Sequence, residues 1–247
     1  MEILDGFSTA QIVAAVVATF LAAIVRGLTG FGFGFLLAPI LALALLPLEA
    51  VLLVNILAFM LALSEVRYVL REAHRSAYWI MGLLLLTTMP GLLLLSATPP
   101  PLARVLIALA ALTAFVVVVY PRRKEPQEPG KFATGATGLI AGVMTGFAAM
   151  PGISVVPYYV RQEMPRVTAK ASMIGIFGVS ALASLLSGAV TGLLQWRLVL
   201  FGLMLFPVMA LGNWLGSLVF GRVSDPVWRA FVGFVLGAAA VAALVRL

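Results

Sequence analysis

The stretch Gly27-Leu-Thr-Gly-Phe-Gly-Phe-Gly-Phe-Leu-Leu-Ala-Pro39 interrupts a chain that is otherwise almost continuously apolar. A second stretch of the same kind, Gly142-Val-Met-Thr-Gly-Phe-Ala-Ala-Met-Pro-Gly-Ile-Ser-Val-Val-Pro157, lies in the other half of the chain. Glycine and proline are the residues that most weaken a helix interior. Both stretches are therefore predicted to break helices, and each is followed by a further apolar run.

The composition places the chain in a membrane. Hydrophobic residues make up 63% of the 247 residues, charged residues make up 10%, and the mean hydropathy is +1.14. A water-soluble fold has too little core to hide this surface, whereas a bilayer solvates it directly. We expect an all-α integral membrane protein whose first apolar run, following Glu2 and Asp5, remains as a helix.

Several classes of function are excluded or disfavoured by what the sequence lacks. Cysteine is absent, so disulfides and thiolate chemistry are excluded. No nucleotide-binding motif and no facing cluster of His and carboxylates is present, so we expect no metal, no cofactor and no enzyme. The net charge of +7 is concentrated in short loops between apolar runs, so it indicates membrane topology and no nucleic-acid partner.

Hydropathy divides the chain into apolar segments. Those that follow the glycine stretches, 35–46 and 153–160, fall short of the roughly 20 residues that a crossing requires and are expected to be re-entrant or half-helices. The remaining segments are long enough to cross or nearly so: 9–25, 50–66, 77–95, 102–120, 132–149, 171–190, 198–220 and 227–245.

The two halves are predicted to be repeats of about five helical segments each. Residues 1–120 form the first repeat, residues 121–131 a polar linker and residues 132–247 the second repeat. Landmark residues recur at an offset of about 117 residues: Pro39 and Pro157, Pro47 and Pro165, Trp79 and Trp196, Pro90 and Pro207.

Basic residues have changed places between the halves, which indicates that the repeats are inverted. Arg161, Arg166 and Lys170 correspond to leucines, and Arg67, Arg71 and Arg75 correspond to apolar residues of the second half. The positive-inside rule then places these loops and the linker in the cytoplasm and both termini outside. Arg104, Arg197 and Arg246 are the exceptions, and single broken helices that span once would instead give parallel repeats.

These features resemble the sulfite exporter TauE/SafE family, also called the 4-toluene sulfonate uptake permease family. The resemblance rests on the first glycine motif with Pro39, its echo ending in Pro157, the repeat, the tryptophans and the charged linker, and it covers essentially the whole chain. In the second motif, Ala148, Ala149 and Met150 replace the expected glycine run. The resemblance implies inner-membrane transport of sulfur-containing anions or organosulfonates such as sulfite, sulfoacetate, taurine or thiosulfate.

Broken helices at corresponding points of two repeats mark the expected substrate site. Backbone amides at the glycines and the positive ends of half-helices beginning near Phe35 and Ile153 favour a small anion. Phe31, Phe33, Phe35, Phe147 and Tyr159 are wall candidates that equally fit helix packing or contact with lipid. The substrate-site residues predicted from the two motifs are Gly27, Thr29, Gly30, Gly32, Gly34, Pro39, Thr145, Gly146, Pro151, Gly152, Ser154, Pro157 and Tyr158.

Arg26 stands directly before the first motif, and Met144 is its counterpart in the second half. An intramembrane arginine predicts a functional site, with the substrate anion as its partner. The alternative is that Arg26 reaches lipid headgroups at the cytoplasmic face. Candidates for the pathway or for coupling are Asn55, Glu49, Glu65 and Asn213.

The sequence thus predicts a secondary or facilitative permease that works by alternating access. An anion channel and a carrier of another anion such as a carboxylate are the alternatives, and a membrane-embedded enzyme is a weaker one. Gly-x-x-x-Gly pairs such as Gly188 with Gly192, Gly212 with Gly216 and Gly233 with Gly237 fit either contacts within the chain or the seam of a homodimer.

Overall fold

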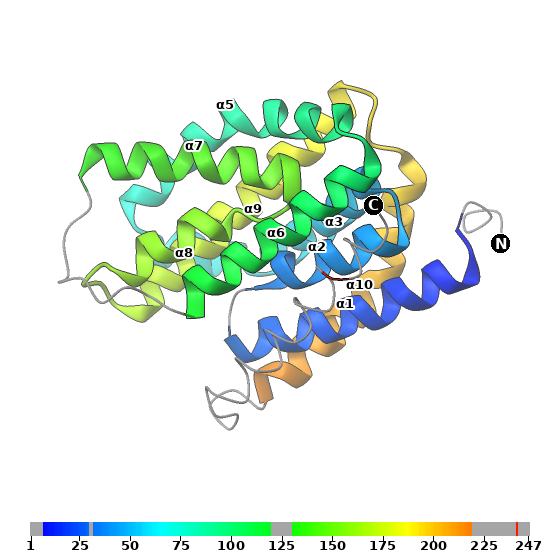
Figure 1. The fold of residues 1–247 in the computed structure, drawn as a ribbon. Coiled ribbons are helices and arrows are strands. Elements are labelled where there is room, and N and C mark those ends of the chain that lie inside the picture. Colours follow the sequence, from blue (N-terminus) through cyan, green and yellow to red (C-terminus); the bar gives the residue numbers. More distant parts are fainter. Residues whose placement is uncertain (1–6, 30–31, 120–129, 219–240, 242–247) are drawn as a thin grey trace.

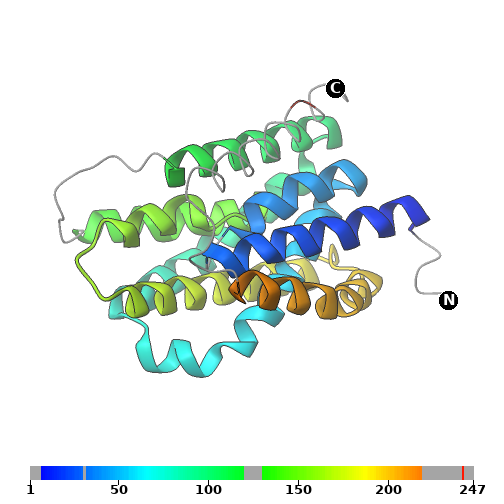
Figure 2. The same cartoon turned by 90° about the horizontal axis from the view of Figure 1, so that it is seen from below.

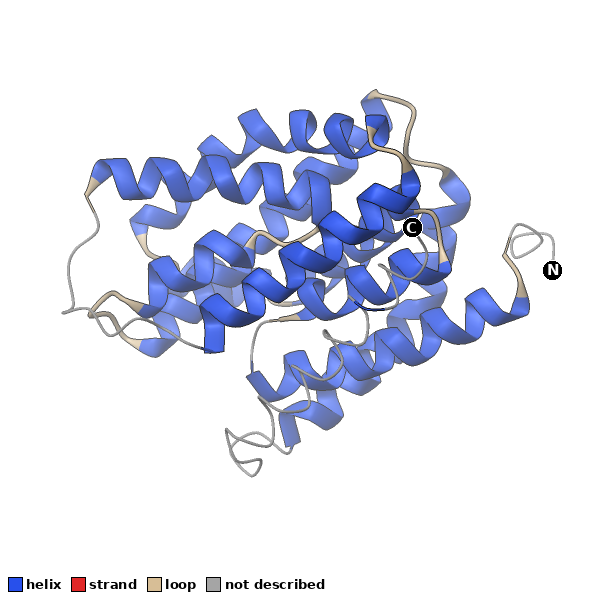
Figure 3. Cartoon of the chain, viewed as in Figure 1, coloured by secondary structure: helices blue, strands red, loops and turns tan. Residues whose placement is uncertain are grey.

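The computed structural model describes residues 7–29, 32–119, 130–218 and 241, and these contain helices and loops but no strand (Figure 3). The helices lie side by side in one bundle (Figures 1 and 2). In chain order they are α1 (Thr9–Thr29), α2 (Phe33–Ala44), α3 (Pro47–Ser64), α4 (Val66–Glu72), α5 (Arg75–Ala97), α6 (Pro100–Val119), α7 (Lys131–Ala148), α8 (Gly152–Val160), α9 (Arg166–Val190) and α10 (Trp196–Leu218).

The observed helices confirm the all-helical expectation and most of the expected segments. Apart from the seven-residue α4, the helices after the glycine stretches are the shortest of those described: α2 has 12 residues and α8 has 9. At 1.5 Å per residue they are about 18 and 14 Å long, well short of a bilayer core of about 30 Å. The short helix α4 was not expected, because its mixed sequence resembles a loop. The linker up to residue 129 and the segment 227–245 lie outside the described residues.

Six of the described helices, α1, α3, α5, α6, α9 and α10, are long and apolar enough to cross a membrane. α7 is not among them, although it has 18 residues, because glycine and threonine dilute its apolar side chains. Trp79 and Trp196, at the starts of α5 and α10, are 73% and 69% exposed. Exposed tryptophans at helix ends are typical of the membrane interface.

Glycines bring α1 and α10 into close contact. A Cβ at Gly27 would overlap the carbonyl oxygen of Asn213, and one at Gly216 would overlap that of Ile24. Towards the start of both helices, Gly212 lies against Phe20 and Phe7 stacks on Phe201. The two helices therefore run in the same direction, and the Gly212/Gly216 pair forms a contact within the chain.

A second glycine seam joins α7 to α5. Gly138, Gly142 and Gly146, spaced four residues apart on one face of α7, leave no space for a Cβ against Ile80, Leu84 and Thr88 respectively. Across the seam, Gly91 of α5 meets the backbone of Val143. Because the residue numbers at these contacts rise together along the two helices, α5 and α7 are also parallel.

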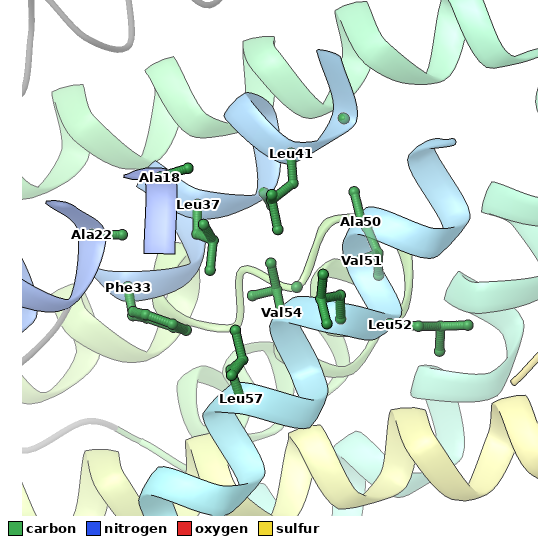
Figure 4. Close-up of a cluster of buried hydrophobic side chains, with 14 of the residues drawn as sticks. Ala18, Ala22, Phe33, Leu37, Leu41, Ala50, Val51, Leu52, Val54 and Leu57 are labelled. Atoms are coloured by element: carbon green, nitrogen blue, oxygen red, sulfur yellow. The ribbon is translucent and has the colours of Figure 1, made fainter. Parts of the chain in front are cut away.

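The centre of the bundle is α3, packed against α2, α9 and α10. Leu37 and Leu41 of α2 gather with Val51, Val54 and Leu57 of α3 in one buried cluster (Figure 4). Towards α9, Leu52 of α3 lies next to Gly188, Asn55 donates a hydrogen bond to Ser184, and Ala62 lies next to Gly178. As residue numbers rise on α3 they fall on α9, so these two helices are antiparallel.

Candidate functional site

The two interruptions meet in the middle of the bundle. Gly32, directly before α2, has φ 96°, and Ala149, directly after α7, has φ 56°. These residues occupy corresponding positions of the two motifs and share a left-handed backbone that glycine adopts easily. A Cβ at Gly34 would overlap the carbonyl oxygen of Ala149, so the backbones of the two interruptions are in direct contact.

A cavity of about 70 Å³ opens where the interruptions meet. Its wall combines the first turns of α2 and α8 with residues of α3 and α9 and the end of α1. The lining residues are Arg26, Gly32, Phe33, Gly34, Phe35, Val54, Asn55, Ala58, Leu61, Ala62, Ala114, Ala149, Met150, Pro151, Gly152, Ile153, Val156, Ile174, Phe177 and Ser180. Most of this surface is apolar, and Arg26 is the charged member of the set.

Arg26 is held between two polar side chains. Its Nη1 donates to Oδ1 of Asn213 at 3.0 Å, and its Nη2 donates to Oε2 of Glu65 at 3.1 Å. The Arg26 side chain is 12% exposed and that of Glu65 is 29% exposed. The sequence analysis named a substrate anion as the partner of Arg26. The structure gives it an internal counterion instead, which leaves its contact with substrate a prediction.

Two uncharged polar side chains also reach the cavity. Asn55 Nδ2 donates to the carbonyl of Val51 and to Oγ of Ser184, which links α3 to α9. Ser180 lies on the same face of α9 and donates from Oγ to the carbonyl of Phe177. Because the donors of both residues have protein partners, their oxygens are the atoms with the greater capacity left for hydrogen bonds.

The hydroxyls predicted beside the interruptions point into protein. Thr145 is fully buried and donates to the carbonyl of Ala141, while Ser154 donates to that of Thr137. The Tyr158 hydroxyl is hydrogen-bonded to Thr134 at 2.8 Å. None of these three residues is part of the cavity lining. Gly30 and the side chain of Thr29 lie outside what the structure describes.

The remaining predicted residues divide between packing and lining. Gly27 and Gly146 are contact points of the two glycine seams, and Pro39 and Pro157 lie inside α2 and α8. The predicted residues that do line the cavity are Arg26, Gly32, Gly34, Asn55, Pro151 and Gly152, together with the wall candidates Phe33 and Phe35. Part of each motif therefore reaches the cavity, and contact of these residues with a substrate stays a prediction.

Glu49 lies at the other end of α3 and takes no part in the cavity. Its Oε1 accepts from Nη2 of Arg197 at 3.1 Å, and its Oε2 accepts from the backbone N–H of Leu46. Arg104 lies at the same end and donates from Nε to the carbonyl of Ala42 near the end of α2. Both arginines that were exceptions to the charge rule, among those the structure describes, thus have acceptors within the protein.

The sequence analysis missed lining residues of α3 and α9. Ala58 and Ala62 of α3 face Phe177 and Ser180 of α9 across the cavity. These residues look like ordinary membrane-helix residues in the sequence, and no motif marks them. One available signal is that Ala62 and Ser180, both small, lie 118 residues apart, the same offset as Pro39 and Pro157.

A family model described as sulfite exporter TauE/SafE matches residues 15–243, nearly the whole chain. The chain belongs to this family. Together with the six apolar helices, membership makes this TauE/SafE protein a multi-pass membrane protein of a transporter family. No curated protein and no solved structure matched the chain.

Proposed function

We propose that this TauE/SafE protein is a secondary or facilitative carrier of a small sulfur-containing anion, sulfite or a short organosulfonate. The observation that carries the proposal is the central cavity, which lies where both helix interruptions meet and has Arg26 as its charged lining residue. A guanidinium at membrane depth is costly unless it pairs with an anion, and its planar donors match the oxygens of a sulfite or sulfonate group.

The backbone around the cavity supports an anionic ligand. Phe33 and Gly34 in the first turn of α2, and Gly152 and Ile153 in the first turn of α8, line it. N–H groups in the first turn of a helix have no partner inside that helix and carry a partial positive charge. Two such turns and one guanidinium around one space favour negative charge there.

The size of the cavity favours a small substrate. Since about 15 Å³ of such space is enough for one water, about 70 Å³ has room for several waters or one small polyatomic anion. Phe33, Phe35 and Phe177 lie on its wall and leave little space for an aromatic ring. Among sulfur-containing anions, we therefore favour sulfite and short alkyl sulfonates over aryl sulfonates.

An inverted repeat would let the carrier work by alternating access. Under the expected correspondence, α1 pairs with α7, α3 with α9 and α5 with α10. The antiparallel contact of α3 with α9 supports inversion, as does the exchange of partners in which α1 joins α10 and α7 joins α5. In such carriers, one group of helices rocks against the other around a fixed central site.

The proposed location of the protein is the inner membrane. In the proposed orientation both termini lie outside and the linker lies in the cytoplasm. Arg26, Glu65 and α4 then lie towards the cytoplasmic face, and the Glu49 and Arg197 pair lies towards the outer face. The ion pair of Arg197 with Glu49 supports this orientation, because it compensates the charge of one of the two described arginines that lie towards the outer face.

Uptake into proteoliposomes tests the proposal. Purified protein is reconstituted and offered labelled sulfite, thiosulfate, taurine, sulfoacetate, an aryl sulfonate and a carboxylate control, with and without the unlabelled anion inside. We expect saturable uptake of sulfite or a short sulfonate that is accelerated by the same anion on the far side. Conduction without acceleration would indicate a channel, and transport of the carboxylate alone would overturn the substrate assignment.

Two arginine variants test the site within the same experiment. Arg26→Gln removes the charge from the cavity wall, and we expect it to lose transport. Arg71→Gln makes the same change on exposed α4, and we expect it to keep transport. Equal amounts of folded protein in the vesicles, measured after reconstitution, make the comparison valid. Wild-type transport by Arg26→Gln would remove Arg26 from the substrate site.

A further inference from the structure

Arg26 and Glu65 are arranged so that an anion bound in the cavity would compete with Glu65 for the guanidinium. Arg26 lines the cavity, whereas Glu65 follows α3 one turn beyond the lining residues Leu61 and Ala62 and is not part of the lining. The guanidinium thus lies between the cavity and the carboxylate and contacts the carboxylate directly. Any anion that binds the guanidinium from the cavity shares it with Glu65.

Charge neutrality makes this sharing costly unless Glu65 changes state. With Glu65 ionised, the Arg26–Glu65 pair has no net charge. A monovalent anion added to it would leave one uncompensated negative charge at membrane depth, where few waters screen it. A proton on Glu65 restores neutrality, because the cluster then contains one guanidinium, one anion and one neutral carboxylic acid.

We propose that Glu65 is the proton-coupling residue of this carrier, so that one proton binds its carboxylate for each monovalent anion that binds Arg26, and both cross together. This inference rests on the proposed function and names its coupling ion. In the empty carrier Glu65 is ionised and paired with Arg26. In the loaded carrier the anion takes the place of the carboxylate as the counterion, and the proton leaves with the anion on the other side.

The surroundings of Glu65 favour this role. Its side chain is 29% exposed and follows the end of α3, so under the proposed orientation a proton can reach it from the cytoplasmic side without passing through the cavity. Arg26 is the group that forms an ion pair with it among the described residues. The other charged or titratable groups on helices packed around α3 are Arg67, Tyr68, Arg71 and Glu72 of α4, Arg75 and Tyr78 of α5, Arg104 of α6, Lys131 of α7, Arg166 and Lys170 of α9, and Arg197 of α10.

The two carboxylates of α3 differ in this respect. Glu49 also pairs with an arginine, but Arg197 is not among the residues of the cavity wall. An anion bound in the cavity therefore has no reason to release Glu49. The coupling role is assigned to the carboxylate whose partner also faces the substrate.

The test separates exchange from accumulation in proteoliposomes loaded with the transported anion. Wild-type protein in vesicles with an alkaline interior should accumulate the anion, by about tenfold for each pH unit if one proton accompanies each anion. A pH-sensitive dye outside should report proton uptake into vesicles when the anion is added. Glu65→Gln should bring the accumulation ratio to about one at any exchange rate it retains, whereas Glu72→Gln, the same change on exposed α4, should accumulate like the wild type.

Each outcome bears on the inference in a different way. Accumulation by Glu65→Gln equal to the wild type would overturn it, and so would wild-type uptake without proton movement, a measurement that needs no variant. A wild type that exchanges no anion at all would overturn the proposed function and this inference together. Exchange without pH-driven accumulation by the wild type would overturn only the coupling and leave the carrier intact.

Discussion

Arg26 is the charged residue of the cavity lining, and two side chains hold its guanidinium. Glu65 supplies its charge balance and Asn213 orients its other nitrogen. Hydrogen bonds to a charged group contribute more than those between neutral groups, and a partly buried carboxylate left without its partner costs stability. The pair is therefore expected to stabilise the fold as well as to serve the site.

Stability of Arg26 variants tests this double role. We expect Arg26→Gln to lose about 2 kcal/mol, because Glu65 and Asn213 lose their charged donor. The double variant Arg26→Gln/Glu65→Gln should recover most of this loss, because no unpaired carboxylate remains, while transport stays absent. Denaturant titration in detergent, followed by tryptophan fluorescence, measures the difference. A double variant as unstable as Arg26→Gln would show that the unpaired carboxylate of Glu65 does not cause the loss of stability.

Ala149 is the residue that departs most clearly from the glycine pattern of the first motif. Its φ of 56° lies in the left-handed region, which costs a residue with a Cβ roughly 1 to 2 kcal/mol. We expect Ala149→Gly to stabilise the protein by about 1 kcal/mol. Ala148→Gly, at the last residue of α7, should destabilise it instead, because the change removes a fully buried methyl group from a residue that already has a helical backbone. Thermal unfolding of both variants in one detergent provides the comparison, and a loss on Ala149→Gly would contradict the reasoning.

At the scale of the element, the seam between α5 and α7 depends on the absence of side chains. Gly146 lies against the backbone of Thr88 and Leu92, which has no freedom to move aside as a side-chain tip would. Close approach of backbones is one of the main sources of helix association in a membrane, where burial from water contributes little. Gly138, Gly142 and Gly146 are therefore structural, even though the last two belong to the second motif.

A pair of alanine substitutions on α7 tests the seam. Gly146→Ala should destabilise the protein by about 1 to 3 kcal/mol through overpacking. Gly135→Ala lies on the same helix with no atom within 4 Å of the added Cβ, so we expect it to be neutral or stabilising by up to about 1 kcal/mol. Resistance to denaturant in detergent reports both. Equal effects of the two substitutions would mean that helix propensity decides and that packing does not.

Sequence reasoning located the elements well and the contacts between them less well. The starts of α2 and α8 follow from glycine and proline chemistry, which is local, and both lie within two residues of the expected positions. The pairing of Arg26 with Glu65 joins residues on two helices, and its geometry depends on how α1, α3 and α10 pack. Gly146 illustrates the same limit, because a packing glycine and a glycine that exposes an amide to a ligand look identical in a sequence.

At the scale of the whole molecule, the proposed topology predicts opposite faces for two alanines. Ala97 ends α5 and Ala133 lies near the start of α7, and both are exposed. The chain contains no cysteine, so single cysteine variants need no prior removal of native thiols. We expect a membrane-impermeant maleimide added to intact cells to label Ala97→Cys and to leave Ala133→Cys unlabelled until the membrane is opened. The reverse pattern would reverse the orientation of the protein in the membrane, and labelling of both from outside would contradict a crossing by α6, the helix between the two positions.

The pairing of α1 with α10 has a consequence for how the molecule is made. The Arg26 and Asn213 side chains that meet in the finished bundle are 187 residues apart in the chain. At a synthesis rate of 5 to 20 residues per second, roughly 10 to 40 s pass between their appearances at the ribosome. Throughout that interval α1 lacks the helix that packs against Gly27, and the Arg26 guanidinium lacks the amide of Asn213. Assembly of this protein therefore begins with a helix that needs a temporary companion, and we expect the insertion machinery of the cell to provide it.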